Sequence, residues 1–278
     1  MERLTSVTID VCALKQNLSF VDPLLITLSG HLAPSILRVG GSDQNNFNFS
    51  SQPDRNFVTC YDKAGREAPL GCHQQCTFDS QYWASLHNFV DATGLQLLFG
   101  LSPADAENAN SLIYHTAHRN YSGMFGYSFG NEQINEINEI NDYFTKMTSV
   151  RKALNEAHGE STSSRPLLIA PDTGIGPRQL WISPAGIAND TSVNKHLDFV
   201  GRFTAKCAPL LDAVSWHTYD FRSQEIGGAD HQPWPYPTPT VNASRFWEPE
   251  YLDVAGRLAD NVSDIVAEAA PSLLGKVC

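Results

Sequence analysis

Short apolar runs alternate along the chain with stretches whose apolar residues recur at helical spacing. The runs, rich in Val, Ile, Leu and Phe, indicate buried strands, and the helical spacing indicates helices that cover them. The predicted strands lie at 4–10, 35–41, 95–101, 124–132, 166–172 and 213–220, the predicted helices at 80–92, 142–158, 193–203 and 248–270, and a further strand begins at 275–278. Strands that alternate with helices indicate βαβ units and a parallel sheet.

The number of these units predicts a barrel. Six units, with a seventh begun, favour a (β/α)8 TIM barrel that is incomplete, at about six to seven β/α units. A doubly wound sheet is disfavoured because no G-x-G-x-x-G turn follows the first predicted strand. We expect one partial barrel domain over residues 1–278. In such a barrel the carboxyl ends of the strands converge on one mouth, where active sites lie.

Polar residues end most of the predicted strands, although the strand interiors are apolar. They are Asp10, Gly40-Gly41-Ser42-Asp43, Ser102, Asn131-Glu132, Asp172, and His217 with Tyr219. Barrel geometry would gather them in one pocket, so the sequence predicts an enzyme. Glu132 suits glycosidic bond cleavage, because partial burial raises the pKa of a carboxyl group and lets it protonate the leaving oxygen. An Asn beside it can hydrogen-bond the sugar hydroxyl next to the anomeric carbon.

Composition excludes some partners. The chain is 42% hydrophobic and 18% charged, and it contains no apolar run long enough to span a bilayer, so no transmembrane segment is expected. Nineteen Lys and Arg against 30 Asp and Glu give a net charge of −11, which argues against nucleic acid as a partner. No cofactor is expected.

Six cysteines and six N-x-S/T sequons, at Asn17, Asn48, Asn120, Asn189, Asn242 and Asn261, favour the secretory route and an extracellular or lysosomal location. The start "MERLTSVTID" has no apolar segment of the signal-peptide kind. "CHQQC" at 72–76 lacks a second Cys/His pair at zinc spacing, so no metal is expected. A disulfide among Cys60, Cys72 and Cys76 is predicted instead, with its pairing open.

"GYSFGNEQ" resembles the fourth-strand motif of the heparanase and β-glucuronidase enzymes, glycoside hydrolase family 79 of the Asn-Glu barrel clan. Other segments resemble the family in the same order. "LTSVTIDVC" is similar to its first strand, "PSILRVGGSDQNNF" to its second with the Arg-x-Gly-Gly turn, "LLIAPDTGIGPRQL" to its fifth and "VSWHTYD" to its sixth. The resemblance implies a retaining glycosidase that cleaves β-linked glucuronic acid glycosides in glycans or proteoglycans.

The resemblance also implies residue roles. Glu132 would be the acid/base, and Asn131 its sugar-binding neighbour. The other matching positions imply substrate binding by Asp10, by Gly41 and Ser42 in the second-strand turn, by Asp172 and Arg178 at the strand-five rim, and by His217 and Tyr219, of which Tyr219 supports the nucleophile.

The chain departs from the family pattern in three places. The family nucleophile is a Glu at the end of strand seven, which would follow "GKVC", the C-terminal β-sandwich is absent, and Cys12 stands where an Asn is expected. We therefore expect a fragment or truncated product without measurable turnover of its own. A non-catalytic carbohydrate-binding pseudoenzyme and an inactive fragment are the alternatives.

The segment "INEINEIND" (134–142) reads as a polar insertion after strand four and contains no Lys or Arg. Acidic groups repel sulfates, so this segment and the negative net charge favour a glucuronic-acid glycan of low sulfation over heparan sulfate. Its acids, Glu136, Glu139 and Asp142, are poorly suited to replace the nucleophile, because a retaining pair stands about 5–5.5 Å apart across the scissile bond.

Overall fold

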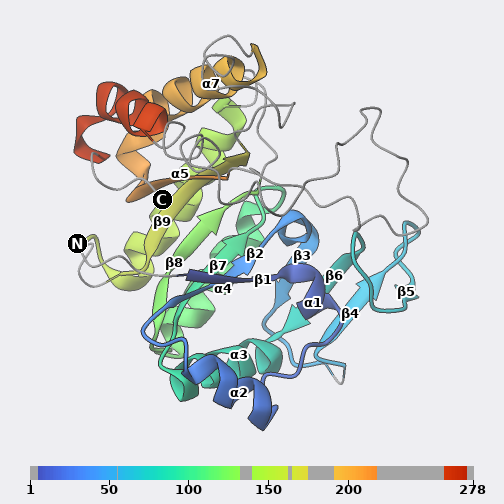
Figure 1. The fold of residues 1–278 in the computed structure, drawn as a ribbon. Coiled ribbons are helices and arrows are strands. Elements are labelled where there is room, and N and C mark those ends of the chain that lie inside the picture. The colour runs from blue at the N-terminus through green and yellow to red at the C-terminus, as the bar shows by residue number, and fades with distance from the viewer. Residues whose placement is uncertain are drawn as a thin grey trace, which may run out of the picture.

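A curled sheet of six parallel strands forms the centre of the protein (Figure 1). The computed structural model describes residues 6–54, 56–131, 140–161, 165–174, 191–217 and 260–273. The strands are β1 (Ser6–Asp10), β2 (Ile36–Gly40), β7 (Gln96–Leu101), β8 (Met124–Phe129), β9 (Leu167–Gly174) and β10 (Ala213–His217), paired in that order. Because neighbours in the sheet follow one another in the chain, the sheet is singly wound, as in a TIM-type barrel, and the described part has six strands where a complete barrel has eight.

Helices connect the strands and cover the sheet. They include α3 (Ser80–Thr93), α4 (Ala106–His118), α5 (Ile140–His158) and α7 (Thr191–Cys207), and residues 260–269 are also helical. The helix α3 begins at Asp79, whose carboxylate accepts from the backbone N–H groups of Gln81 and Tyr82, and ends at Gly94 with φ 70°. None of the described helices has the length and apolar character needed to cross a membrane.

The six predicted strands are confirmed, with ends that differ from the expected ones by a few residues. The predicted helices at 80–92, 142–158 and 193–203 are also confirmed, as α3, α5 and α7. Only the last part of the predicted helix at 248–270 can be compared, because 248–259 lie outside the described residues, as do 218–220 and 275–278. The sequence reading missed α4 and two short helices, α1 (Val11–Lys15) and α2 (Pro23–Gly30).

A second, smaller sheet lies in the connection between β2 and α3 and was not predicted (Figure 1). Its strands are β3 (Phe47–Ser50), β4 (Val58–Tyr61), β5 (Glu67–Ala68) and β6 (Gln75–Asp79), in the order β3-β6-β4-β5. The 3-10 helix η1 (Ser42–Asn46) leads into it from β2. A disulfide between Cys60 and Cys76 joins the antiparallel partners β4 and β6.

One hydrophobic core runs under both sheets. The ring of Phe78, from the small sheet, lies 5.9 Å from Trp83 of α3 and 5.8 Å from Phe99 of β7. All three side chains are buried, and burying one aromatic or aliphatic side chain of this kind contributes roughly 1.5–3 kcal/mol. The small sheet is therefore packed onto the barrel strands and not merely tethered to them.

Candidate active site

Four strands bring polar side chains together at their carboxyl ends. Arg38 of β2 donates through Nη2 to Asn131 Oδ1 at 3.1 Å and to Asp172 Oδ2 at 2.6 Å. The other oxygen of Asp172 lies 3.0 Å from Nε2 of His217, at the end of β10. The structure thus brings the sequence-predicted residues Asn131, Asp172 and His217 together, and Arg38 is the group that connects the first two.

The backbone explains how these residues converge. Parallel pairing aligns the carboxyl ends of β2, β7, β8, β9 and β10 along one edge of the sheet. After β8 the chain turns at Gly130, whose φ of 85° suits a glycine, and this turn brings Asn131 to the buried side. Asp172 has φ 56°, which is uncommon for a residue with a side chain, and its two polar contacts hold it there.

Asp172 carries a negative charge over almost the whole pH range. It is buried, which opposes ionisation, but the hydrogen bond from His217 and the charge of Arg38 outweigh burial and lower the pKa of Asp172 to about 2. Its carboxylate also compensates Arg38, whose side chain is only 16% exposed. A buried guanidinium without such a partner would be strongly destabilising.

Asp10 and Gly41 meet at the ends of β1 and β2. Asp10 is exposed, and its Oδ1 accepts a 2.7 Å hydrogen bond from the backbone N–H of Cys12, which caps α1. A Cβ built on Gly41 would lie 2.3 Å from Asp10 Oδ2, and Gly41 has φ 110°. Only glycine fits here, both because the carboxylate occupies the space of a side chain and because of the backbone angle.

Asp172 lies in the cluster around Arg38, but it is buried inside an ion pair instead of lying at an open rim. Several other predicted residues fall elsewhere. Asp43, which follows the second-strand turn, pairs with Lys15 and lies 3.2 Å from its Nζ. Ser102 donates to the backbone carbonyl of Asn45. Ser42 begins η1, and its side chain is outside the described part of the structure, as are Glu132, Arg178 and Tyr219 altogether.

Arg38 is the site residue that sequence reasoning did not single out. Its signal was present, because Arg38 is the one charged residue in the apolar run "SILRVGG". A charge within a buried strand needs a partner, and in a parallel barrel that partner must come from another strand or from the loop after one.

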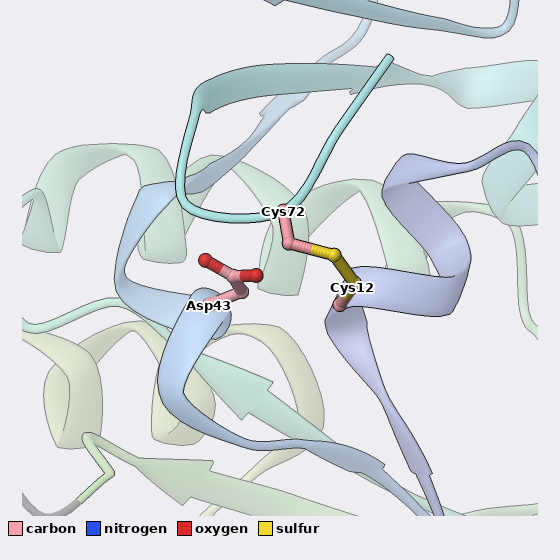
Figure 2. Close-up of side chains that lie close together, drawn as sticks. All are labelled: Cys12, Asp43 and Cys72. Atoms are coloured by element: carbon pink, nitrogen blue, oxygen red, sulfur yellow. A yellow bond between two sulfur atoms is a disulfide. The ribbon is translucent and has the colours of Figure 1, made fainter. Parts of the chain in front are cut away.

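The cysteine pairing corrects part of the sequence prediction. Cys60 pairs with Cys76 as one of the open alternatives, but Cys72 pairs with Cys12, 60 positions earlier. Figure 2 shows the Cys12–Cys72 disulfide with the Asp43 carboxylate beside it. Potential ligand atoms of these three residues lie within 4.8 Å of one another. The disulfide and the Lys15–Asp43 ion pair leave this cluster without a thiolate or an unpaired carboxylate, so it does not suit a metal ion in this state.

A cavity of about 290 Å³ lies at the opposite end of the sheet. It is lined in part by Met124 and Pro166, which stand at and just before the starts of β8 and β9, and by Arg165 and His158. Residues at the amino ends of barrel strands generally serve stability and not catalysis. The strand carboxyl ends, with Arg38 and Asn131, therefore remain the candidate active site.

Comparison with known proteins assigns the fold and family. Residues 11–201 match the family model described as Glycosyl hydrolase family 79, N-terminal domain. A GH51 arabinofuranosidase from Xanthomonas axonopodis pv. citri is similar in structure, with a TM-score of 0.53 and 15% identity over 92% of this chain and 49% of that one. A family 44 xyloglucanase from Paenibacillus polymyxa gives a TM-score of 0.47 and 12% identity over 85% of this chain and 61% of that one. No curated protein matches the sequence. The chain thus spans about half the length of the arabinofuranosidase.

Proposed function

Because the chain belongs to glycosyl hydrolase family 79, we propose that it is the barrel part of a retaining glycosidase that cleaves β-linked glucuronic acid glycosides in glycans or proteoglycans. One observation carries the proposal. The hydrogen bond from Arg38 to Asn131 fixes the residue immediately before Glu132, at the carboxyl end of a barrel strand.

Arg38 also determines which way the Asn131 amide faces. A guanidinium only donates, so the amide oxygen must point toward it. The amide NH2 group of Asn131 is then directed away from Arg38 and can donate to the sugar hydroxyl next to the anomeric carbon. That contact strengthens as positive charge develops on the sugar ring, while Glu132 protonates the leaving oxygen.

The described carboxylates do not provide a nucleophile. Both oxygens of Asp172 are engaged, by Arg38 and by His217. Asp10 caps α1 with one oxygen, and Asp142 is exposed on α5 in an ion pair with Lys146. A retaining glycosidase needs its second carboxylate about 5–5.5 Å from the acid/base. We place the nucleophile outside the described residues and expect no turnover by the 278-residue polypeptide alone.

Charge supports the choice of substrate. Arg38 and Asp172 compensate each other's charge, so this ion pair adds no net charge beside the bound sugar. The chain as a whole has a net charge of −11, and "INEINEIND" after Glu132 has no basic residue. These features favour a glucuronic-acid glycan of low sulfation over heparan sulfate.

The disulfides support a secretory location. Cys12–Cys72 and Cys60–Cys76 use four of the six cysteines, and disulfides persist in oxidising compartments. We propose that the protein is extracellular or lysosomal. Mass spectrometry of the protein from its native source would test this through glycans on the sequons and intact disulfides.

Ligand binding tests the proposed function. Isothermal titration calorimetry should show that the 278-residue chain binds phenyl β-glucuronide more tightly than phenyl β-glucoside, which lacks the carboxylate. Asn131→Ala should weaken binding of both ligands, because it removes the contact to a hydroxyl that they share. Equal affinity for the two ligands would exclude glucuronide selectivity, and retention on a heparin column at physiological salt would contradict the preference for low sulfation.

A further inference from the structure

Asp10 is an exposed carboxylate whose surroundings fix it in one position. The backbone N–H of Cys12 holds Oδ1, and Gly41 leaves the space in which Oδ2 lies. Because the first oxygen is used by the helix cap, Oδ2 is the oxygen that remains to accept from a ligand. Its position depends on where α1 begins.

The helix α1 is too short to hold itself in place. It has five residues, and isolated helices of that length do not form in water. Tertiary contacts must therefore position it. Val11 and Leu14 pack into the core, and Tyr82 of α3 donates to the Leu14 carbonyl. The polar and covalent contacts at the start and end of α1 come from η1 and the loop 72–74 that leads into β6.

Those three segments form a junction, which we define as Cys12 and Lys15 of α1, Asp43 of η1, and Cys72 to Gln74. The disulfide joins Cys12 to Cys72 (Figure 2). Lys15 Nζ donates to Asp43 Oδ1 at 3.2 Å and to the Gln74 carbonyl at 2.5 Å. The backbone N–H of His73 donates to Asp43 Oδ1 at 2.9 Å.

The ionic part of the junction is fully buried. The side chains of Lys15 and Asp43 are 0% and 3% exposed. Burial lowers the pKa of Lys15 against the opposing effect of Asp43, so the ammonium is stable there only while its partner stays in place. The segments can therefore separate only with a large loss of stability, and this makes the junction a rigid support.

We propose that the Cys12–Cys72 disulfide and the Lys15–Asp43 ion pair position the Asp10 carboxylate in advance, so that it can accept a hydrogen bond from a sugar hydroxyl. The proposal rests on the proposed function, because it assumes a glycoside in this site. A carboxylate held in advance loses less conformational freedom on binding, so the junction raises affinity without touching the ligand.

The two disulfides differ in accessibility, which makes the proposal testable. Cys12 and Cys72 are partly exposed, whereas Cys60 and Cys76 are completely buried. A dithiol such as dithiothreitol converts one disulfide into two cysteine thiols and is itself oxidised to its cyclic disulfide. Mild reduction should therefore open Cys12–Cys72 first, and removal of the dithiol with reoxidation should close it again.

The experiment compares two double variants under reduction and reoxidation. The variant Cys60→Ala/Cys76→Ala keeps the Cys12–Cys72 disulfide, which can be reduced and reoxidised. The variant Cys12→Ala/Cys72→Ala keeps the Cys60–Cys76 disulfide instead. Reduction of the first variant should weaken binding of phenyl β-glucuronide about tenfold, the effect of losing one hydrogen bond to a charged group, and reoxidation should restore it. Reduction of the second should leave its affinity unchanged.

A third variant shows whether the junction acts through Asp10. In Asp10→Asn, reduction should cause no further loss of affinity, because the carboxylate that the junction positions is already gone. An additional loss in this variant, or an undiminished affinity in reduced Cys60→Ala/Cys76→Ala, would overturn the proposal.

Hydrogen exchange separates this proposal from the proposed function. Reduction should speed exchange of the amides of residues 12–16 while those of β7 and β8 stay protected. If the oxidised protein binds no glycoside, the proposed function fails. In that case, faster exchange of residues 12–16 on reduction would still support the claim that the junction positions α1. Unchanged exchange would refute that claim too.

Discussion

Arg38 and Asp172 form a 2.6 Å ion pair although their strands, β2 and β9, are separated in the sheet by β7 and β8. Three strand spacings amount to about 14 Å in a flat sheet. The pair therefore joins two strands across the concave face of the curled sheet. Asn131, which follows β8, also contacts Arg38, and this links the shape of the barrel to the position of its candidate site residues.

The Asp172 carboxylate, held by His217 and Arg38, should make stability depend on pH in the acid range. The pKa of Asp172 falls from its ordinary 3.8 to about 2 in the folded protein, so the unfolded chain binds this proton more readily. The contribution of the Asp172 carboxylate, from its hydrogen bond with His217 and its ion pair with Arg38, is therefore complete above pH 4 and is lost as the pH falls toward 2. Its size is about 2 kcal/mol, from 1.36 kcal/mol per pKa unit.

Urea unfolding of the wild type and Asp172→Asn between pH 2 and pH 5 measures this contribution. The difference in free energy of unfolding between the two proteins should grow with pH up to about pH 4 and then level off, because the asparagine does not titrate. A difference that stays constant over the whole range would show that His217 and Arg38 do not hold Asp172 as a carboxylate.

At the other end of the sheet, Asp212 should be the charged residue whose replacement lowers the free energy of unfolding most. Its carboxylate receives Arg165 Nη1 at 2.7 Å, Arg151 Nη2 at 2.8 Å and the backbone N–H of Leu168 at 2.8 Å. Asp212→Asn leaves two buried guanidinium groups without a counter-charge, which should destabilise the protein by about 3–5 kcal/mol.

The matched control is Asp62→Asn, because Asp62 pairs with Arg66 on an exposed hairpin and should change the free energy of unfolding little. Chemical denaturation of both variants measures the difference. Similar losses in the two would contradict the view that burial decides the contribution of these ion pairs.

Gly126 should not accept a side chain. A Cβ at this position would lie 2.8 Å from the backbone carbonyl oxygen of Leu167, in the neighbouring strand β9. The strand cannot move without disturbing the sheet, so Gly126→Ala should destabilise the protein by about 2 kcal/mol. At Gly30, in α2, the added methyl group meets nothing within 4 Å, and Gly30→Ala should stabilise the protein slightly. Thermal melts that rank the two variants the other way would contradict this packing.

The barrel strands could be predicted because their runs are local, apolar and bounded by polar residues. The run at 95–101, for example, becomes β7 with its inner residues Leu97 and Phe99 buried. The small sheet could not be predicted, because its strands are short and it depends on pairing between distant segments. The cross-strand disulfide between Cys60 and Cys76 illustrates this, since spacing alone does not decide which cysteines pair.

The site was predicted in part, for a similar reason. Strand ends identified Asn131, Asp172 and His217, since barrel topology brings such ends together. Sequence position does not tell which polar residue faces inward, however. Asp43 follows the same turn as Gly41, yet it forms a buried pair with Lys15 instead of joining Arg38. Arg38 itself lies within a strand, so a search for polar residues at strand ends does not find it.

Turnover assisted by an added anion most directly tests the claim that Glu132 is the acid and that the nucleophile lies elsewhere. With phenyl β-glucuronide, whose phenolate leaves slowly unless it is protonated, azide would form the new bond at the anomeric carbon as the bond to the phenolic oxygen breaks, and Glu132 would give its proton to that oxygen. The product would be the α-glucuronosyl azide, identified by NMR.

We predict no hydrolysis by the 278-residue chain in buffer, formation of the α-azide when azide is added, and loss of that reaction in Glu132→Gln. Rapid hydrolysis without azide that Glu132→Gln abolishes would place a nucleophile within the chain. Azide-dependent turnover that Glu132→Gln leaves unchanged would remove Glu132 from the chemistry and contradict the account.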